Sequence, residues 1–322
     1  MPVIGKKILY LCSNCVKYLF LSLTIRLMNN KYKGLLLLLL FAFPLLSYSQ
    51  VAKKRWRAYR IEYIAGLGVT NFLGELGGAN QVGTHAFRDL EFSMTRPAAM
   101  IGYRYKLSPT FASCTKISYG VVAGDDKLTK EPFRNKRNLS FKSNIFELST
   151  NIEISFLQEQ VGHRYRLRGV RGMRNIELSS YGFVGIGVFH FNPKAKLNDH
   201  WYQLQPLGTE GQGVVPSRDK YKRTQICVPL GLGAKYAIDR QISVGLEVGL
   251  RYTFTDYIDD VSKSYYYERG GTLVEQLADR SLDDQSHVGQ QRGDPRWNDA
   301  YLFAVFNINY KIRTGRTNYP MF

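Results

Sequence analysis

The stretch ISVGLEVGLRYTF, residues 242–254, decides the fold of this chain. Its apolar side chains occupy every second position, and small or polar side chains fill the positions between them. Because successive side chains of a β-strand point to opposite faces, the stretch predicts a strand with one apolar wall and one polar wall. In a soluble sheet the apolar wall faces a core, whereas in a membrane barrel it faces lipid and the polar wall lines the interior.

The same rhythm occurs eight times after residue 58. The predicted strands are 59–69, 96–107, 111–122, 144–157, 177–191, 224–236, 242–254 and 300–312. Long connections at 70–95, 123–143, 192–223 and 255–299 alternate with the connections 107–110, 158–176 and 238–241. This arrangement is typical of outer-membrane proteins. We therefore predict an all-β fold, an eight-stranded antiparallel transmembrane outer-membrane β-barrel with long extracellular loops and periplasmic turns. Within the last loop, LVEQLAD (273–279) is expected to form a short helix.

The N-terminal region indicates export. From Met28 the chain reads MNNKYKGLLLLLLFAFPLLSYSQ, in which two lysines precede the apolar run 35–46 and small residues precede Gln50. That run is too short for an ordinary transmembrane helix and suits a secretory signal. We predict that 1–49 comprise an over-called start and a signal peptide that begins at Met28. The mature chain then starts near Gln50, and 50–322 form a single β-barrel domain. The expected location is the outer membrane of a Gram-negative, Bacteroidetes-like bacterium.

The charge of the chain limits the class of its partners. It contains 44 Lys and Arg against 26 Asp and Glu, a formal net charge of +18. An exported protein rarely meets nucleic acid, so we expect this charge to attract lipid phosphates or an acidic protein instead. We expect outer-membrane lipid as a partner, and neither nucleic acid nor a small-molecule substrate.

The polar wall of the predicted barrel contains charges of both signs. The candidate lumen ion network comprises Glu62, Arg104, Lys116, Glu147, Glu153, Lys235, Glu247 and Arg251. Eight strands leave an interior just wide enough for side chains to fill. Buried charges must be paired, because an unpaired one costs several kcal/mol. The sequence therefore predicts a filled, ion-paired interior rather than a pore.

Side chains that carry catalytic or metal chemistry are scattered. The histidines are His85, His163, His190, His200 and His287. No spacing among them indicates a metal site, and nothing selects a nucleophile. A rim-active enzyme would have to build a Ser/His/Asp set around His85 or His200. We expect no catalytic residue, no cofactor, no metal and no enzymatic activity.

Three short motifs have an ordinary structural interpretation. Residues 292–294 spell the adhesion tripeptide Arg-Gly-Asp, but the proline that follows favours a turn. The Asp pairs at 259–260 and 283–284 lack the spaced oxygen ligands of a calcium loop. Cys114 and Cys227 fall on inward positions of strands on different sides of the barrel, so no disulfide is expected.

The connection at 158–176 is unusually basic. Five arginines lie within eleven residues: Arg164, Arg166, Arg168, Arg171 and Arg174. Guanidinium groups offer paired donors to carboxylates and phosphates. The predicted topology places this turn in the periplasm. There it is either a solvated turn beside anionic phospholipid or a docking arm for an acidic protein surface.

Several segments resemble a known family. They are YIAGLGVTNFLGELGG, YGFVGIGVFHFNPKAKLN, LGTEGQG, PLGLGAKYAIDRQISVGLEVGLRYTFTDYIDDVS and RGDPRWNDAYLFAVFNINYKI. These segments, spread over most of 59–312, resemble the PorG-like outer-membrane barrels of the Bacteroidetes type IX secretion system. The resemblance implies a non-enzymatic structural or anchoring component for protein transport. Such a component associates with a periplasmic ring of PorK- and PorN-like proteins and, in gliding bacteria, supports motility.

Two other functions stay open at this level. A small outer-membrane porin would share the strand pattern and would conduct ions in planar bilayers. A rim-active outer-membrane enzyme of unrelated role would share it too. A secretion component should instead co-purify with periplasmic partners and show no conductance.

Overall fold

The computed structural model describes residues 55–76, 92–129, 131–157, 178–283 and 285–314. These residues belong to the compact unit Ala52–Phe322. The predicted leader at 1–49 and the arginine-rich connection at 158–176 lie outside the described residues. No described helix is long and apolar enough to cross a membrane.

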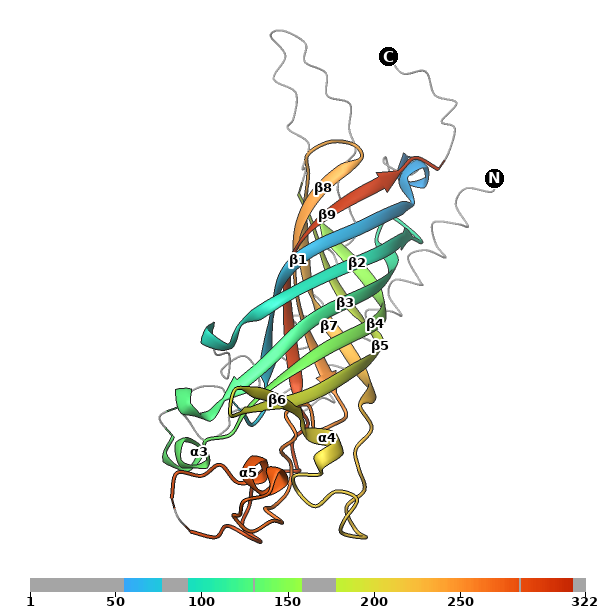
Figure 1. Cartoon of the computed structure of the whole chain (residues 1–322). Helices are drawn as coiled ribbons and strands as arrows, with labels where there is room; N and C mark the ends of the chain where they lie inside the picture. The colour runs from blue at the N-terminus through green and yellow to red at the C-terminus, as the bar shows by residue number, and fades with distance from the viewer. Residues whose placement is uncertain (1–54, 77–91, 130, 158–177, 284, 315–322) are drawn as a thin grey trace, which may run out of the picture. The chain divides into compact units, whose positions relative to one another are not determined.

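Eight antiparallel strands close into a barrel (Figure 1). They are β1 (Ile61–Leu73), β2 (Arg96–Lys106), β3 (Phe111–Asp125), β4 (Ser140–Leu157), β5 (Leu178–Leu197), β7 (Thr224–Ala237), β8 (Ile242–Thr253) and β9 (Ala300–Ile312). Each strand pairs with its neighbours in the chain, and the β1–β9 pairing closes the ring. The predicted fold class is therefore confirmed. A ninth strand, β6 (His200–Gln203), pairs with the end of β5 and does not belong to the ring.

Strand β8 shows which wall faces the interior. Glu247 and Arg251 are 3% and 1% exposed, whereas Leu246, next to Glu247, is 54% exposed. The polar wall therefore lines the lumen and the apolar wall faces outward, which is the arrangement of a membrane barrel. Without lipid around it, this apolar surface would be an exposed patch of a kind that soluble monomers avoid.

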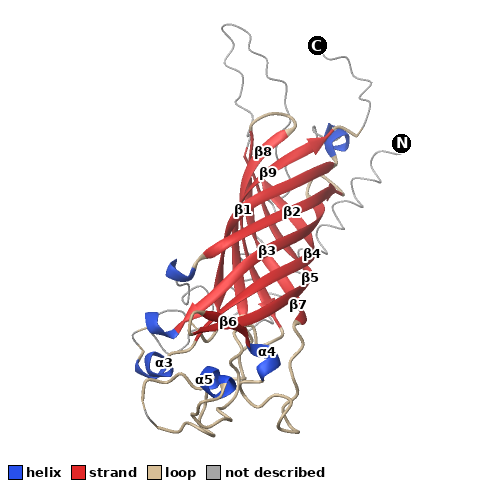
Figure 2. Ribbon diagram, in the orientation of Figure 1, coloured by secondary structure: helices blue, strands red, loops and turns tan. Residues whose placement is uncertain are grey.

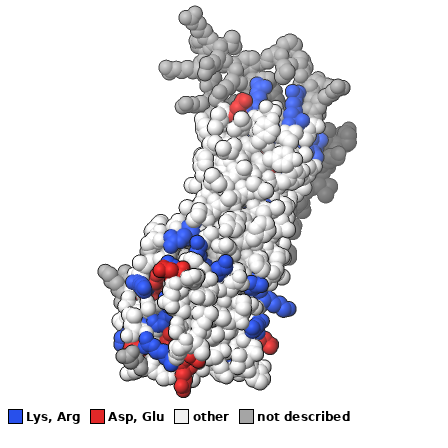
Figure 3. All heavy atoms as spheres, viewed as in Figure 1, with Lys and Arg blue, Asp and Glu red and all other residues white. Residues whose placement is uncertain are grey.

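The outward apolar residues form a continuous belt. On β4 the belt runs from Phe146 to Phe156, which are 54% and 58% exposed. Ten residues of a tilted strand rise about 25 Å, the height of the apolar band of outer-membrane barrels. Figure 3 shows charged side chains gathered at the two ends of the described molecule, with few between them.

The connections differ sharply between the two ends of the barrel (Figure 2). At one end, tight turns join β2 to β3 and β7 to β8, as predicted at 107–110 and 238–241. The Ser108 hydroxyl accepts hydrogen bonds from the backbone N–H groups of Thr110 and Phe111 and so stabilises the first turn. Long loops occupy the other end, with short helices α3 (Pro132–Arg137), α4 (Leu204–Leu207) and α5 (Leu273–Ala278). The predicted helix at 273–279 is confirmed by α5, which a Thr272/Glu275 capping box begins.

Several strands extend beyond their predicted ends on the loop side. β1, β3 and β5 continue to Leu73, Asp125 and Leu197, and β4 begins at Ser140. The alternating pattern is lost in the last residues of β1 and β3 because loops cover both faces there. The β5–β6 hairpin was not predicted. Its turn residues Asn198 and Asp199 both have positive φ, the conformation that a two-residue hairpin requires and that Asn and Asp tolerate.

Candidate functional site

The eight residues of the predicted lumen ion network all point into the barrel. The most exposed of them, Lys235, is 7% exposed. They come from β1, β2, β3, β4, β7 and β8, and strand alternation directs each one inward. The structure brings them into three connected groups along the lumen.

Arg104 is the centre of the group nearest the tight turns. Its Nη1 donates to Glu62 Oε2 at 2.7 Å, and its Nε donates to Glu153 Oε2 at 2.5 Å. Lys235 Nζ lies 3.1 Å from Glu62 Oε2, and Lys106 Nζ, outside the predicted set, lies 2.8 Å from Glu62 Oε1. Two carboxylates, on β1 and β4, are thus neutralised by three cations, two on β2 and one on β7, which ties these four strands together across the lumen.

Two further pairs occupy the rest of the charged lumen. Lys116 Nζ contacts both carboxylate oxygens of Glu247 at 2.6 and 2.7 Å, and the Tyr181 hydroxyl donates to Glu247 at 2.9 Å. Arg251 Nε donates to Glu147 Oε2 at 3.2 Å. All eight charges therefore have a partner of opposite sign. Because the side chains are almost completely buried, the lumen is filled rather than open.

Aromatic rings close the lumen toward the long loops. Phe189 packs on Phe191 and on Tyr301, with ring centroids 5.6 and 5.4 Å apart. Phe191 stacks on Tyr221, which in turn stacks on Tyr257 at 4.7 Å. The last two residues belong to loops, so a column of rings joins the barrel interior to the loops. Sequence reasoning missed this layer, because Phe189 and Phe191 occupy inward positions at which the two-wall pattern predicts polar side chains.

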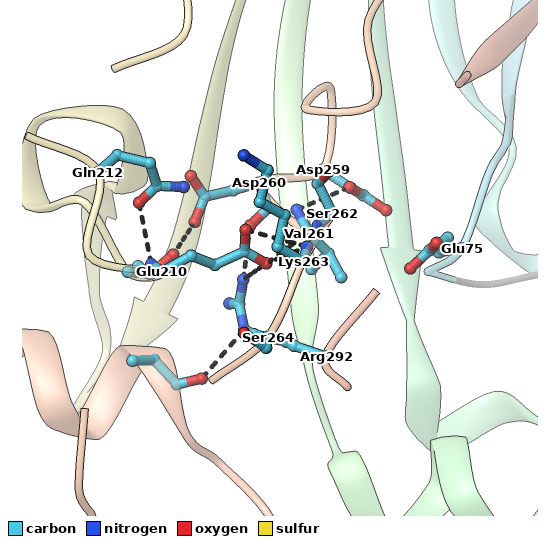
Figure 4. Close-up of polar contacts among 12 residues, drawn as sticks. Glu75, Glu210, Gln212, Asp259, Asp260, Val261, Ser262, Lys263, Ser264 and Arg292 are labelled. Carbon is cyan, nitrogen blue, oxygen red and sulfur yellow. Dashed lines mark hydrogen bonds and ion pairs between the residues drawn. The ribbon is translucent and has the colours of Figure 1, made fainter. Parts of the chain in front are cut away.

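The described loop residues 126–139, 204–221 and 255–299 form a loop cap over this end, and Arg292 is its centre (Figure 4). Arg292 is 2% exposed. Its Nη1 donates to Glu210 Oε1 at 3.1 Å and to the Asp260 carbonyl at 2.6 Å, and its Nε donates to the Ala278 carbonyl. One side chain thus joins the 204–221 loop to two parts of the 255–299 loop.

Glu210 adds hydrogen bonds from the backbone to this arrangement, which we term the Arg292 lock. Its carboxylate accepts the N–H groups of Ser262 and Lys263 at 3.0 and 3.1 Å, as Figure 4 shows. The neighbouring Asp260 carboxylate accepts the hydroxyls of Thr209 and Tyr221 at 2.5 and 2.6 Å. Burial raises the pKa of Asp260 to about 6, although the Arg292 guanidinium acts in the opposite direction. These bonds join the 204–221 loop to the 255–299 loop.

A second buried arginine joins the remaining loop to the cap. Arg137 donates from Nε to Asp126 Oδ2 at 2.8 Å and from Nη1 to the Arg292 carbonyl at 2.6 Å. Arg137 and Asp126 are 5% and 0% exposed. The loop between β3 and β4 is therefore held directly against the residue at the centre of the cap.

Four carboxyl groups form an acidic cluster beside this lock: Glu75, Asp256, Asp259 and Asp299. Burial raises the pKa of Glu75 to about 7 and that of Asp256 to about 9, and the nearby Asp259 carboxyl also contributes at Asp256. Burial and the neighbouring carboxyls raise the pKa values of Asp259 and Asp299 well above the usual range. The cluster therefore holds protons that ordinary carboxyl groups release. Backbone N–H groups of Leu76 and Ile258 donate to Asp259 and Asp299.

The motifs considered for chemistry occupy structural positions. The described residues contain no group of three or more His, Cys, Asp and Glu side chains that could hold a metal ion. Cys114 and Cys227 are buried and free. The adhesion tripeptide at 292–294 cannot present its arginine, because Arg292 is bonded inside the cap. His287 lies against Asp279 at 2.9 Å in the same loop.

The structure describes only some of the remaining histidines and none of the predicted docking arm. His190 and His200 contact only Thr224 and the Asn198 carbonyl among the hydrogen bonds of the described residues. His85, His163 and the candidate docking arginines from Arg164 to Arg174 lie outside the described residues. The role of that arm therefore stays a prediction.

A closed eight-stranded barrel with a lipid-facing belt, a filled charged lumen and a loop cap defines an outer-membrane β-barrel protein. The chain belongs to the family described as "Domain of unknown function (DUF6089)", which it matches over residues 62–269. No curated protein matches the chain.

Solved outer-membrane proteins are similar to this chain at low sequence identity. The attachment invasion locus protein Ail of Yersinia pestis is 9% identical with a TM-score of 0.34, over 79% of this chain and 99% of that one. OprG of Pseudomonas aeruginosa is 7% identical with a TM-score of 0.36, over 80% and 98%. A major outer membrane protein of Thermus thermophilus is 11% identical with a TM-score of 0.32, over 78% and 99%. The assignment of the fold rests on the strand pairing and burial above.

Proposed function

We propose that this protein is a non-enzymatic, structural component of the outer membrane that anchors a type IX protein secretion system through a periplasmic ring of PorK- and PorN-like proteins. The filled lumen is the observation that carries the structural part of this proposal. Every charge of the predicted network has a partner of opposite sign and is nearly inaccessible to water. A barrel of this kind acts through its surfaces rather than by passing a solute.

The secretion part of the proposal rests on the resemblance to PorG-like barrels. It is compatible with a filled barrel whose loop cap is locked by Arg137 and Arg292, because an anchor needs rigidity and not an opening. The arginine-rich connection at 158–176 is the proposed docking arm, since its end of the barrel is the one with the tight turns. Five guanidinium groups there would attract an acidic surface of the ring.

Affinity purification from native outer membranes tests the proposal. The wild-type protein should bring down periplasmic ring proteins, and a variant with Arg164, Arg168 and Arg171 changed to Glu should lose them together with secretion. The matched control changes the same three residues to Lys, which retains the charge and should retain most of the binding. Both variants should still insert as heat-modifiable barrels.

Three results would contradict the proposal. Intact secretion in the Glu variant would remove the arm from the mechanism. Steady single-channel conductance of the wild-type protein in planar bilayers would favour a porin. Labelling of a Gly169→Cys variant by an impermeant reagent in intact cells would place the arm outside the cell and invert the topology.

A further inference from the structure

The outer surface of the barrel changes character just beyond the apolar belt on strands β4, β5 and β7. The belt ends on these strands at Phe146, Val188 and Ile226, which are each about half exposed: 54%, 48% and 50%. The next outward residue on β4 toward the loops is Asn144, and the one after it is Lys142. The wall therefore turns from apolar to polar and then to basic within four residues.

Strand pairing assembles several cations at this level. Lys142 lies directly opposite Lys194 on β5, and the β5–β6 hairpin places Lys196 opposite Trp201. Arg223, the residue before β7, donates to the side-chain oxygens of Asn192 and Gln203 at 3.4 and 3.5 Å. Lys142, Lys194, Lys196, Trp201 and Arg223 together form what we term the basic corner.

Two of the lysines in the basic corner, Lys142 and Lys194, lack a carboxylate partner among the described residues. Like charges directly opposite one another destabilise a sheet, yet Lys142 and Lys194 occupy such a pair. Within the described ranges neither forms an ion pair with a carboxylate, and the Lys142 ammonium instead lies 5.6 Å from the centre of the Trp201 ring. Lys196 is paired with the exposed Asp199 at 2.6 Å. An anion from outside the chain would relieve the repulsion that remains.

The height of the corner identifies that anion. Four residues of a tilted strand rise about 9 Å, so Lys142 stands about 9 Å beyond the end of the belt. The polar headgroup layer extends roughly 5–8 Å beyond the hydrocarbon on each side, and a lysine can bend its ammonium group back into that layer. A half-exposed tryptophan beside the cations is typical of this interface.

We propose that the basic corner binds the phosphate groups of anionic lipid headgroups in the leaflet on the loop side of the membrane. Lysine ammonium groups and the Arg223 guanidinium act as donors to phosphate oxygens, and Trp201 packs against the adjoining part of the lipid. The bound lipid neutralises the Lys142–Lys194 pair. It also fixes the depth of β4, β5 and β6 at the membrane surface. This site is independent of the periplasmic docking arm.

Native mass spectrometry of the folded barrel in detergent tests the site. Diphosphoryl lipid A is the anionic probe and phosphatidylcholine is the neutral probe. The test variant changes Lys142, Lys194 and Lys196 to Gln. The matched control changes three exposed loop lysines, Lys127, Lys136 and Lys263, to Gln, so that the same charge is lost elsewhere. All substituted residues lie at the surface, and an unchanged heat-modifiable band establishes that each barrel is folded.

The expected result is a preference of the wild-type protein for the anionic probe that the test variant loses by about tenfold or more and the control retains. An equal concentration of inorganic phosphate should not displace the lipid, because the site binds a phosphate group that is held at the membrane surface. Equal loss in test and control variants, or no preference in the wild type, would overturn the proposal. Displacement by inorganic phosphate would do so too, since it would identify a soluble-anion site.

Discussion

The ion pair between Lys116 and Glu247 offers the sharpest test of the filled lumen. The two residues lie on β3 and β8, are 131 positions apart in the chain, and meet with Nζ–Oε distances of 2.6 and 2.7 Å. Both are almost inaccessible to water, at 0% and 3% exposure. Changing Glu247 to Gln keeps the size of the side chain and removes only its charge. Lys116 then retains Glu153, at 3.9 Å, as its nearest carboxylate.

The distance between the two charges sets the size of the expected change in the free energy of unfolding. At 2.6 Å the attraction is about 6 kcal/mol for an effective dielectric constant of roughly 20. Removing two ions from water costs several kcal/mol each, so the intact pair is close to neutral relative to an apolar pair. Removing one partner loses the attraction but leaves the other ion desolvated. We therefore expect Glu247→Gln to lower the free energy of unfolding by about 3–5 kcal/mol.

Urea unfolding in detergent micelles, followed by loss of the heat-modifiable band, measures this change. Lys116→Met should destabilise the barrel by a similar amount, because it leaves Glu247 buried without its main cation. The double variant Lys116→Met/Glu247→Leu should recover most of the loss. As a control, Asp199→Asn breaks the exposed pair with Lys196 and should leave unfolding unchanged.

The recovery in the double variant is the decisive observation. If both single variants are as stable as the wild type, the two side chains are hydrated and the lumen is not the dry, filled interior described above. If the double variant is as unstable as the sum of the single variants, the losses come from packing and not from charge.

Two further predictions concern the belt and the loop cap. Leu246→Arg should destabilise the inserted barrel by about 2–4 kcal/mol when its unfolding is measured in vesicles, whereas Leu282→Arg in the cap should not; equal effects would contradict the lipid-facing assignment. In the acidic cluster, the raised pKa values of Glu75, about 7, and Asp256, about 9, mean that the folded cap binds protons that the unfolded chain releases near pH 4. The resulting stability is complete below about pH 4 and is lost as the pH rises through about 7 and 9. Hydrogen exchange of residues 255–299, corrected for its intrinsic rate, should be slower at pH 5 than at pH 9. Asp256→Asn should flatten this dependence, and protection that rises with pH would refute it.

Much of the barrel can be predicted from the sequence of single strands. In β8 the positions of Leu246 and Glu247 already define two walls, because strand alternation is a property of the local backbone. The tight turns at 107–110 and 238–241 are equally local, since a few residues set the direction of the chain. The sequence indicates the β5–β6 hairpin only weakly. Its turn is the Asn198–Asp199 pair, which predicts a hairpin only once both flanking segments are known to be strands.

The loop cap was beyond sequence reasoning. Arg292 meets Glu210 across 82 positions, and Arg137 meets the Arg292 carbonyl across 155. No periodicity connects such residues, and the tripeptide at 292–294 even suggests an exposed role for an arginine that is buried. Likewise, the raised pKa values of the acidic cluster come from burial among carboxyl groups of separate loops.

The sequence by itself determined the number of strands in the barrel, the two walls of each and the residues available to fill a lumen, because these follow from the alternation of side chains along an extended backbone. Only the tertiary structure decided which charges meet one another and how the loops are held together. Those outcomes depend on closing β1 against β9. Closure brings residues more than a hundred positions apart within hydrogen-bonding distance and removes them from water.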